Sequence, residues 1–179
     1  MKHLAEDDET RFEALFETHW ERVCKVVFRL IGNWDEAEDL ALETFIRLYR
    51  RPHLLGRGQN PEGWLYRVAT NLGLNAVRAG QRRKRYEIQA GKQLIEASPP
   101  QNPVRETEKR EEREHVRRVL SHIRPRSAKL LILRYSGLSY SELAAVLGVS
   151  PASIGSMLVR AEREFERCYH ESIGDRSCI

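Results

Sequence analysis

Two helix starts and one helix end lie within residues 139–155, which read SYSELAAVLGVSPASIG. Ser139 is followed three residues later by Glu142, the capping-box pattern in which the two residues satisfy free backbone N–H groups reciprocally. The apolar residues that come next predict a short helix. Gly148 suits the left-handed position just past the end of that helix.

A second helix is predicted directly after this turn. Ser150 is a suitable N-cap, and Pro151 would stand at the first helical position, where its missing N–H costs nothing. Its apolar face consists of Ile154, Leu158, Ala161 and Phe165. Two helices joined in this way predict a helix-turn-helix, whose second helix lies in the DNA major groove. The alternative is a plain helical hairpin with good caps.

The outward face of the second helix has an unusual composition for a base-reading surface. Base-reading helices usually offer Arg, Lys, Asn or Gln near their start, because these side chains bind base edges in pairs of hydrogen bonds. Here the first turns offer Ser153, Gly155 and Ser156, and the basic residues Arg160 and Arg163 come later. We therefore expect groove docking with weak base readout.

The first half of the sequence is also helical. Apolar stripes with steps of three and four predict helices over residues 11–31, 34–50 and 62–86. Gly32 ends the first helix and Asn33 is the N-cap of the second. Residues 52–61, with two prolines and two glycines, predict a loop.

A loss of periodicity separates the two halves. Residues 88–104 contain three prolines and predict a flexible linker. The sequence has no strand-like alternation and no internal repeat. We therefore expect an all-α protein of two small helical domains, residues 1–87 and 105–179, the second of which contains the helix-turn-helix.

Positive charge is concentrated locally. The 179 residues include 30 Lys and Arg against 26 Asp and Glu, a net charge of only +4. Residues 62–86 alone hold six Lys and Arg against one Glu. Four of these cations form the run Arg82, Arg83, Lys84 and Arg85. The run suits phosphate contacts on DNA, and the alternative is a solvated helix end.

Several function classes are excluded. The three cysteines are scattered and odd in number, and with the six histidines they form no metal-ligand spacing. No nucleophile motif or phosphate-binding glycine loop is present. No apolar run approaches the roughly 18 residues of a membrane span, and the first ten residues do not resemble a signal peptide. We expect a soluble cytoplasmic protein that binds no metal or cofactor, does not insert into membranes and is not an enzyme.

With both halves considered, the chain resembles the extracytoplasmic-function (ECF) sigma factors of the sigma-70 family of bacteria. The resemblance spans about residues 12–86 and 116–167. The motifs that carry it, in family order, are Glu36–Leu40, Glu43–Arg47, Gly63–Ala69, Asn71–Leu72, Leu133–Tyr135, Gly137–Tyr140, Glu142–Ala144 and Leu147–Val149.

The resemblance implies a transcription initiation factor that directs core RNA polymerase to promoters and helps to open the −10 DNA. It implies contacts with the β′ coiled coil and β flap of the polymerase, and regulation by an anti-sigma factor. The residues implied in polymerase binding are Glu38, Asp39, Glu43 and Arg47. An acidic helix face of this kind attracts a partner of opposite charge, and the alternative is an ordinary solvated face.

The resemblance also assigns DNA-binding positions in both halves. Residues 51–61 and the helix after them would meet the −10 element as single-stranded DNA, through Arg57, Asn60, Arg67, Asn71, Asn75, Arg78, Arg82, Arg83, Lys84 and Arg85. We expect Trp64 to pack in the core rather than to stack on a base. The −35 element would be met by Ser150, Ser153, Ser156, Arg160 and Arg163.

The sequence departs from the family pattern at Leu42, at Asn75 and over residues 153–157, where family members have more basic residues. We therefore hypothesise that promoter choice depends mainly on the −10 half.

Two other functions are alternatives to a sigma factor. A stand-alone helix-turn-helix regulator would leave the first 86 residues unexplained. A nucleic-acid enzyme would need a catalytic constellation, which this sequence lacks.

Overall fold

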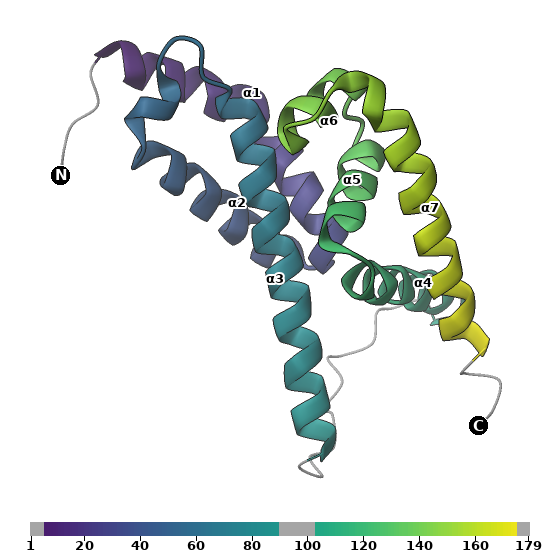
Figure 1. Cartoon of the computed structure of the whole chain (residues 1–179). Helices are drawn as coiled ribbons and strands as arrows, with labels where there is room; N and C mark the ends of the chain where they lie inside the picture. Colours follow the sequence, from purple (N-terminus) through teal and green to yellow (C-terminus); the bar gives the residue numbers. More distant parts are fainter. Residues whose placement is uncertain (1–5, 90–102, 175–179) are drawn as a thin grey trace.

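The computed structural model describes residues 6–89 and 103–174, and Figure 1 shows their arrangement. In this part of the chain every element is a helix, which confirms the all-α prediction. The elements are α1 (Glu6–Ile31), α2 (Trp34–Tyr49), the 3₁₀ helix η1 (Pro52–Leu55), α3 (Pro61–Gln89), α4 (Pro103–His122), α5 (Pro125–Tyr135), α6 (Tyr140–Leu147) and α7 (Pro151–Gly174).

Helices α1, α2 and α3 pack together as the first half of the molecule (Figure 1). Their fully buried side chains include Val23, Phe45 and Leu65. Helices α1 and α3 approach closely at Gly73, where a Cβ atom would lie 2.5 Å from Cδ1 of Leu30. The close approach explains a glycine in the middle of a helix, a position that otherwise costs about 1 kcal/mol relative to alanine.

The helix-turn-helix predicted from residues 139–155 is confirmed. The Ser139 hydroxyl accepts a hydrogen bond from the Glu142 backbone N–H at 3.3 Å, and the Glu142 carboxylate accepts one from the Ser139 N–H at 2.7 Å. Gly148 adopts the left-handed conformation, with φ of 66°. Pro151 begins α7. The Ser150 carbonyl accepts a hydrogen bond from the Ser153 N–H at 3.0 Å.

The expected apolar face of α3 is confirmed in part. The periodicity of residues 62–86 predicted an inner stripe that includes Trp64, Leu65, Val68, Ala69 and Leu72. Leu65 and Ala69 are buried, whereas Trp64, Val68 and Leu72 are only partly buried. The structure also buries Tyr66, Thr70 and Leu74 of α3, which the predicted stripe did not include. The sequence did not define one buried face of α3, because this helix contacts α1 and α2 in the first half of the molecule and α6 in the second half. The loop expected over residues 52–61 also contains η1.

The two halves lie against each other, a feature that the sequence did not predict. Helix α3 contacts α6, α4 and α5, and α1 contacts α5. Helix α3 ends at Gln89 and α4 begins at Pro103, so both helices extend into the expected linker 88–104. The rest of that linker lies outside the described residues. The domain boundaries therefore remain a proposal.

No helix in the described ranges is by itself long and apolar enough to cross a bilayer, and α6 with α7 passes that test only as a pair bent by 88°.

Candidate nucleic-acid and partner interfaces

The acidic face of α2 lies on the outside of the first half. Asn33 caps this helix, because its side-chain oxygen accepts the Glu36 N–H at 3.0 Å. Asp39 is exposed, whereas Glu43 is bound by Arg47, whose Nε donates to Oε1 at 2.7 Å. Surface pairs of this kind contribute less than about 1 kcal/mol, so the pair leaves both side chains available to a partner.

Two apolar side chains accompany the acidic residues of α2. Trp34 is 41% exposed and Leu42 is 46% exposed. Glu38 stands between them at helical spacing, and its carboxylate accepts the Trp34 indole N–H at 2.9 Å. The face therefore combines apolar anchors with carboxylates, which is typical of a protein-binding surface. The sequence prediction included Glu38 but missed the contribution of Trp34.

A cavity of about 390 Å³ lies where the loop before α3 meets α1. Gln59 and Asn60 line one side of it. Asn60 is also the N-cap of α3, since its side-chain oxygen accepts the Gly63 N–H at 2.8 Å. A Cβ atom on Gly63 would lie 2.7 Å from the Asn60 amide nitrogen, so glycine at this position permits the cap. Arg57 is exposed in the loop and is not among the lining residues.

The other side of this cavity comes from α1. Arg11, Thr18 and His19 line it, and the sequence prediction named none of them. His19 is buried, and its Nδ1 lies 3.1 Å from the Tyr66 hydroxyl. Burial raises the pKa of Tyr66 to about 12, so the hydroxyl remains protonated at neutral pH. The cavity thus has several hydrogen-bonding groups on a rigid wall.

The predicted −10 residues on α3 differ in their surroundings. Asn71, Asn75, Arg82 and Arg83 are exposed, and Arg78 is partly buried. The side chains of Lys84 and Arg85 lie outside the described part of the structure. Trp64 is half-buried against the core, and the guanidinium of Arg51 lies 5.5 Å from the centre of its ring.

Arg67 is engaged by the second half of the molecule. Its Nε donates to the backbone carbonyl of Val146 at 2.8 Å, and Nη2 lies 3.5 Å from the carbonyl oxygen of Ala145. Lys129 of α5 is close enough that burial, and next the positive charge of Arg67, lower its pKa. A residue expected to bind DNA therefore stands at the contact between the halves.

The predicted −35 residues lie along α7. Ser156, Arg160 and Arg163 are exposed and Ser153 is partly buried. Arg160 folds back along its own helix, with Nε donating to the Ser156 carbonyl at 3.1 Å. The second predicted helix therefore presents the exposed arginines Arg160, Arg163 and Arg167, with a short polar stretch before them.

Helix α5 adds positive charge beside α7. Arg124 and Arg126 line a hollow of about 320 Å³ together with Arg160. Arg124 is neutralised by Glu164 of α7, at 2.9 Å, whereas Arg126 is exposed. The hydrogen bond from Arg124 lowers the pKa of Glu164 to about 2. The sequence prediction missed Arg126, because only the tertiary fold places it beside the second helix.

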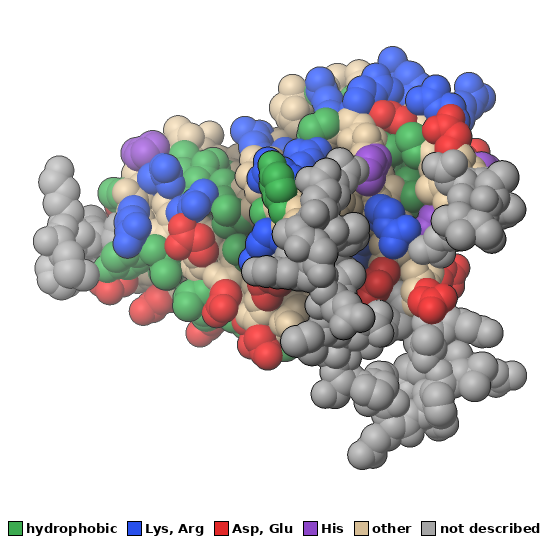
Figure 2. Space-filling model, turned by 90° about the horizontal axis from the view of Figure 1, so that it is seen from below, with side chains coloured by type: hydrophobic (Ala, Val, Ile, Leu, Met, Phe, Trp, Pro, Cys, Tyr) green, Lys and Arg blue, Asp and Glu red, His purple; other side chains and the backbone are tan. Residues whose placement is uncertain are grey.

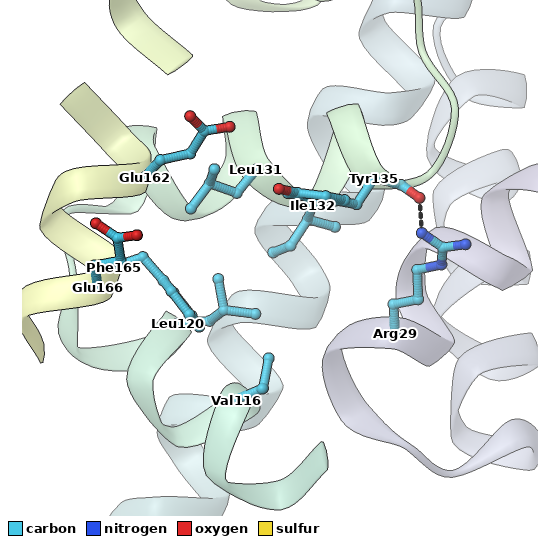
Figure 3. Close-up of a pocket in the computed structure, with 9 residues that line it drawn as sticks. All are labelled: Arg29, Val116, Leu120, Leu131, Ile132, Tyr135, Glu162, Phe165 and Glu166. Atoms are coloured by element: carbon cyan, nitrogen blue, oxygen red, sulfur yellow. Dashed lines mark hydrogen bonds between the residues drawn. The ribbon is translucent and has the colours of Figure 1, made fainter. Parts of the chain in front are cut away.

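A third hollow lies among α4, α5 and α7 (Figure 3). It has a volume of about 650 Å³ and an apolar floor. Arg29 of α1 stands at one end, where it donates a hydrogen bond to the Tyr135 carbonyl. Glu162 and Glu166 stand at the opposite side (Figure 3). The floor is formed by Val116, Leu120, Leu131, Ile132 and Phe165.

Charge is segregated on the surface seen from below. Figure 2 shows Lys and Arg side chains gathered at the upper right, over the second half, and Asp and Glu side chains along the lower edge of the first half. Within residues 6–89 and 103–174, no group of three or more His, Cys, Asp or Glu side chains is placed to hold a metal ion.

Comparison with known proteins gives two matches along this chain. Residues 15–83 match Sigma-70 region 2, and residues 113–165 match Sigma-70, region 4. The chain belongs to the ECF branch of the sigma-70 family. The first match covers α2 and most of α1 and α3, and the second covers α5, α6 and most of α7. From here on we call the two halves region 2 and region 4.

The curated relatives are named as RNA polymerase sigma factors. The chain is 33% identical over 156 residues to the ECF RNA polymerase sigma factor SigE of Mycolicibacterium smegmatis, covering 86% of this chain and 59% of that protein. It is 26% identical to the RNA polymerase sigma factor YlaC of Bacillus subtilis, covering 87% of this chain and 90% of that one. The chain thus spans less than two thirds of the SigE relative.

Two solved structures have a similar fold. One is the sigma factor RpoE in complex with the anti-sigma factor NepR from Bartonella quintana, with a TM-score of 0.51, 20% identity and coverage of 88% of this chain and 95% of that one. The other is CnrH in complex with the cytosolic domain of CnrY, with a TM-score of 0.52, 20% identity and coverage of 87% and 85%.

Proposed function

We propose that this protein is an RNA polymerase sigma factor that directs core polymerase to specific promoters and helps to open the −10 DNA. The observation that carries the proposal is the polar cavity between α1 and Asn60, which lies at the start of α3 on the same chain as a helix-turn-helix. We propose the boundaries 1–87, 88–104 and 105–179 for region 2, the linker and region 4.

The −10 element would be held as a separated strand. A base turned out of its stack needs a pocket with hydrogen-bonding edges, and the cavity offers the Asn60 amide, Gln59 and Arg11. The Asn60 oxygen is used in the helix cap, so its NH₂ group remains to donate. Neighbouring nucleotides would run along Asn71, Asn75 and Arg78. Arg57, Arg67, Arg82, Arg83, Lys84 and Arg85 would neutralise phosphates, a contribution that is independent of sequence and sensitive to salt.

The −35 element would be met by α7. Ser150, Ser153 and Ser156 allow the backbone to approach the groove, and Arg160 and Arg163 would bind phosphates or base edges. Arg126 adds a cation from α5. Because these contacts are mostly with the backbone of the duplex, we propose that the −35 half contributes affinity and the −10 half contributes sequence choice.

The polymerase would bind both regions. The α2 face with Glu38, Asp39, Glu43 and Arg47 suits the β′ coiled coil, and the apolar hollow of region 4 suits the β flap. An anti-sigma factor is a further proposed partner, in keeping with the complex of RpoE with the anti-sigma factor NepR among the similar structures. We propose that the protein works in the cytoplasm without a cofactor and leaves catalysis to the polymerase.

Run-off transcription with purified core polymerase tests this function. We expect the protein to direct initiation from a subset of a promoter library, and to bind promoter DNA poorly when core polymerase is omitted. Tight binding of promoter DNA by the chain alone, without stimulation of transcription, would instead favour a stand-alone regulator. The family matches to both regions support the sigma factor over that alternative.

A further inference from the structure

The cavity between α1 and the start of α3 has a buried histidine on its wall. His19 of α1 is 8% exposed, and it lines the cavity together with Asn60 and Glu62. Burying a polar side chain costs free energy unless its hydrogen-bonding atoms find partners. Both ring nitrogens of His19 therefore need a partner, and the two nitrogens have different surroundings.

One ring nitrogen is held by the protein itself. Nδ1 of His19 lies 3.1 Å from the hydroxyl oxygen of Tyr66, which is 2% exposed. The two rings meet edge to face, with 86° between their planes and 5.8 Å between their centres. Because burial raises the pKa of Tyr66 to about 12, its hydroxyl keeps a proton that it can donate to Nδ1. Tyr66 thereby fixes the orientation of the imidazole ring.

The other ring nitrogen of His19, Nε2, lies 3.8 Å from Oε1 of Glu62. A carboxylate only accepts hydrogen bonds, so the neutral imidazole beside it carries its proton on Nε2 and accepts the Tyr66 hydroxyl at Nδ1. A distance of 3.8 Å is too long for a hydrogen bond between the two groups. The Nε2–H of His19 and the carboxylate of Glu62 therefore form a donor and an acceptor side by side on the cavity wall.

A donor beside an acceptor matches the edge of a nucleobase. Each of the four bases has, on its Watson–Crick edge, an acceptor atom next to an N–H group. A phosphate has only acceptors, and its charge would be repelled by Glu62. The volume of about 390 Å³ is in the range of pockets that hold small ligands. The pair therefore favours an extruded base over the DNA backbone.

We propose that His19 is a specificity-determining residue of the −10 half. Its Nε2–H donates to an acceptor atom of one extruded base, and Glu62 accepts the neighbouring N–H of that base. Tyr66 is a positioning residue, since it acts on the base only through the tautomer of His19. A base that turned an N–H group toward Nε2 would place two donors against each other in a buried site, which is costly. This inference deepens the proposed function and rests on it, because it needs −10 DNA in the cavity.

Substitution of His19 by the two amide residues tests this role. The amide nitrogen of asparagine takes about the place of Nδ1, and that of glutamine takes about the place of Nε2. His19→Asn therefore keeps a partner for Tyr66 but removes the donor that faces the cavity, whereas His19→Gln keeps that donor. His122→Asn makes the same change at an exposed histidine of α4 and is the matched control.

The measurement is run-off transcription with core polymerase on a set of promoters that carries each of the four bases at each −10 position. We expect wild type, His122→Asn and His19→Gln to share a preference of about tenfold at one position, the effect of one hydrogen bond to a buried group. His19→Asn should lose the preference at that position and keep the preferences at all others. Circular dichroism checks that the variants have equal helical content.

Tyr66→Phe is a second variant, which decides the question if His19→Asn fails to fold. It keeps the aromatic ring but removes the hydroxyl, so the proton of His19 is no longer directed to Nε2. We expect a several-fold weaker preference at the same position, with the other positions unchanged.

Two results would overturn the proposal. One is a folded His19→Asn that keeps the wild-type preference at every position. The other is a folded His19→Asn that reduces transcription equally from all promoters, which is the effect expected of a purely structural histidine. Tyr66→Phe is judged by the same two outcomes. Failure of the proposed function would look different, because wild type itself would then direct no transcription from any promoter, and the role of His19 would fall with it.

Discussion

The guanidinium of Arg67 on α3 binds the carbonyl of Val146 at the end of α6, across 79 residues of sequence. The last carbonyls of a helix carry partial negative charge and lack partners in the helix, so they attract a cation much as a phosphate does. The cation that we propose for a DNA phosphate therefore also suits a helix end. The structure uses it for the second purpose.

Asn60 has a capping role and a proposed base-binding role, and two substitutions separate them. Asn60→Asp keeps an acceptor for the Gly63 N–H but loses the NH₂ donor, so we expect normal stability with at least a tenfold loss of promoter-specific transcription. Asn60→Ala should lose transcription and also about 1 kcal/mol of stability, because the cap is lost. Run-off assays and urea denaturation measure the two effects. Full activity of Asn60→Asp would remove the cavity from the proposed site.

Leu42 is an exposed leucine on the proposed polymerase-binding face. Leu42→Ala should leave stability almost unchanged and weaken binding to core polymerase by about tenfold, since burying a leucine at an interface contributes roughly 1.5 kcal/mol. Val159→Ala removes an equally exposed aliphatic side chain from α7 and serves as the control. Fluorescence titration of labelled protein with core polymerase gives both affinities. Equal affinities of the two variants would argue against this face.

Promoter-element swaps test the unequal division of sequence reading between the two regions. Because α7 begins with small polar residues, changing the −35 sequence should reduce transcription only a few-fold, whereas changing the −10 sequence should abolish it. The measurement is run-off transcription on hybrid promoters. A −35 change that abolishes activity, with −10 changes tolerated, contradicts the hypothesis.

Two glycines of region 4 should respond to alanine in opposite directions. Gly148 has φ of 66°, so Gly148→Ala should destabilise region 4 by about 1–2 kcal/mol. Gly155 lies within α7, and the nearest atom to an added Cβ is Tyr140 Cε2 at 3.9 Å. Gly155→Ala should therefore stabilise by up to about 1 kcal/mol. Thermal unfolding of both variants provides the comparison, and shifts of the same sign would contradict the turn geometry.

Glu164 makes the stability of region 4 depend on pH. The hydrogen bond from Arg124 is the main cause of its pKa of about 2, below the ordinary 4.5. A carboxylate whose pKa is lower in the folded state stabilises the fold above pH 4.5, and loses this contribution as the pH falls toward 2. Glu164→Gln should therefore be less stable than wild type at neutral pH and converge with it near pH 2. Glu166→Gln, an exposed position on the same helix, should keep the wild-type profile in urea denaturation across pH.

The parts of the fold that follow from neighbouring residues were predictable from the sequence. The Ser139–Glu142 cap, the left-handed Gly148 and the start of α7 at Pro151 each depend on a few consecutive residues. The wall of the cavity formed by Arg11 and its neighbours on α1 was not predictable, because about 50 residues separate it from Asn60.

The contact between the two halves could not be predicted from the sequence, for a related reason. Arg67 looks like any exposed helical arginine in the sequence, and its acceptor is a backbone atom that every residue type possesses. Periodicity predicted that residues 62–86 form a helix but did not fully define its buried face, because α3 is covered on more than one side. Position-by-position roles for DNA and polymerase contacts came from the family resemblance and remain predictions.

Most acceptors of the contacts that join the regions are main-chain carbonyl oxygens: those of Tyr135, Gly137, Ala145 and Val146. Substitutions in region 4 leave these oxygens in place as long as α6 and its turn keep their shape. The side chains of α7 are then free to diverge toward new promoters while the attachment to region 2 persists. Promoter preference could therefore evolve largely independently of the contacts that hold region 4 against region 2 in this chain.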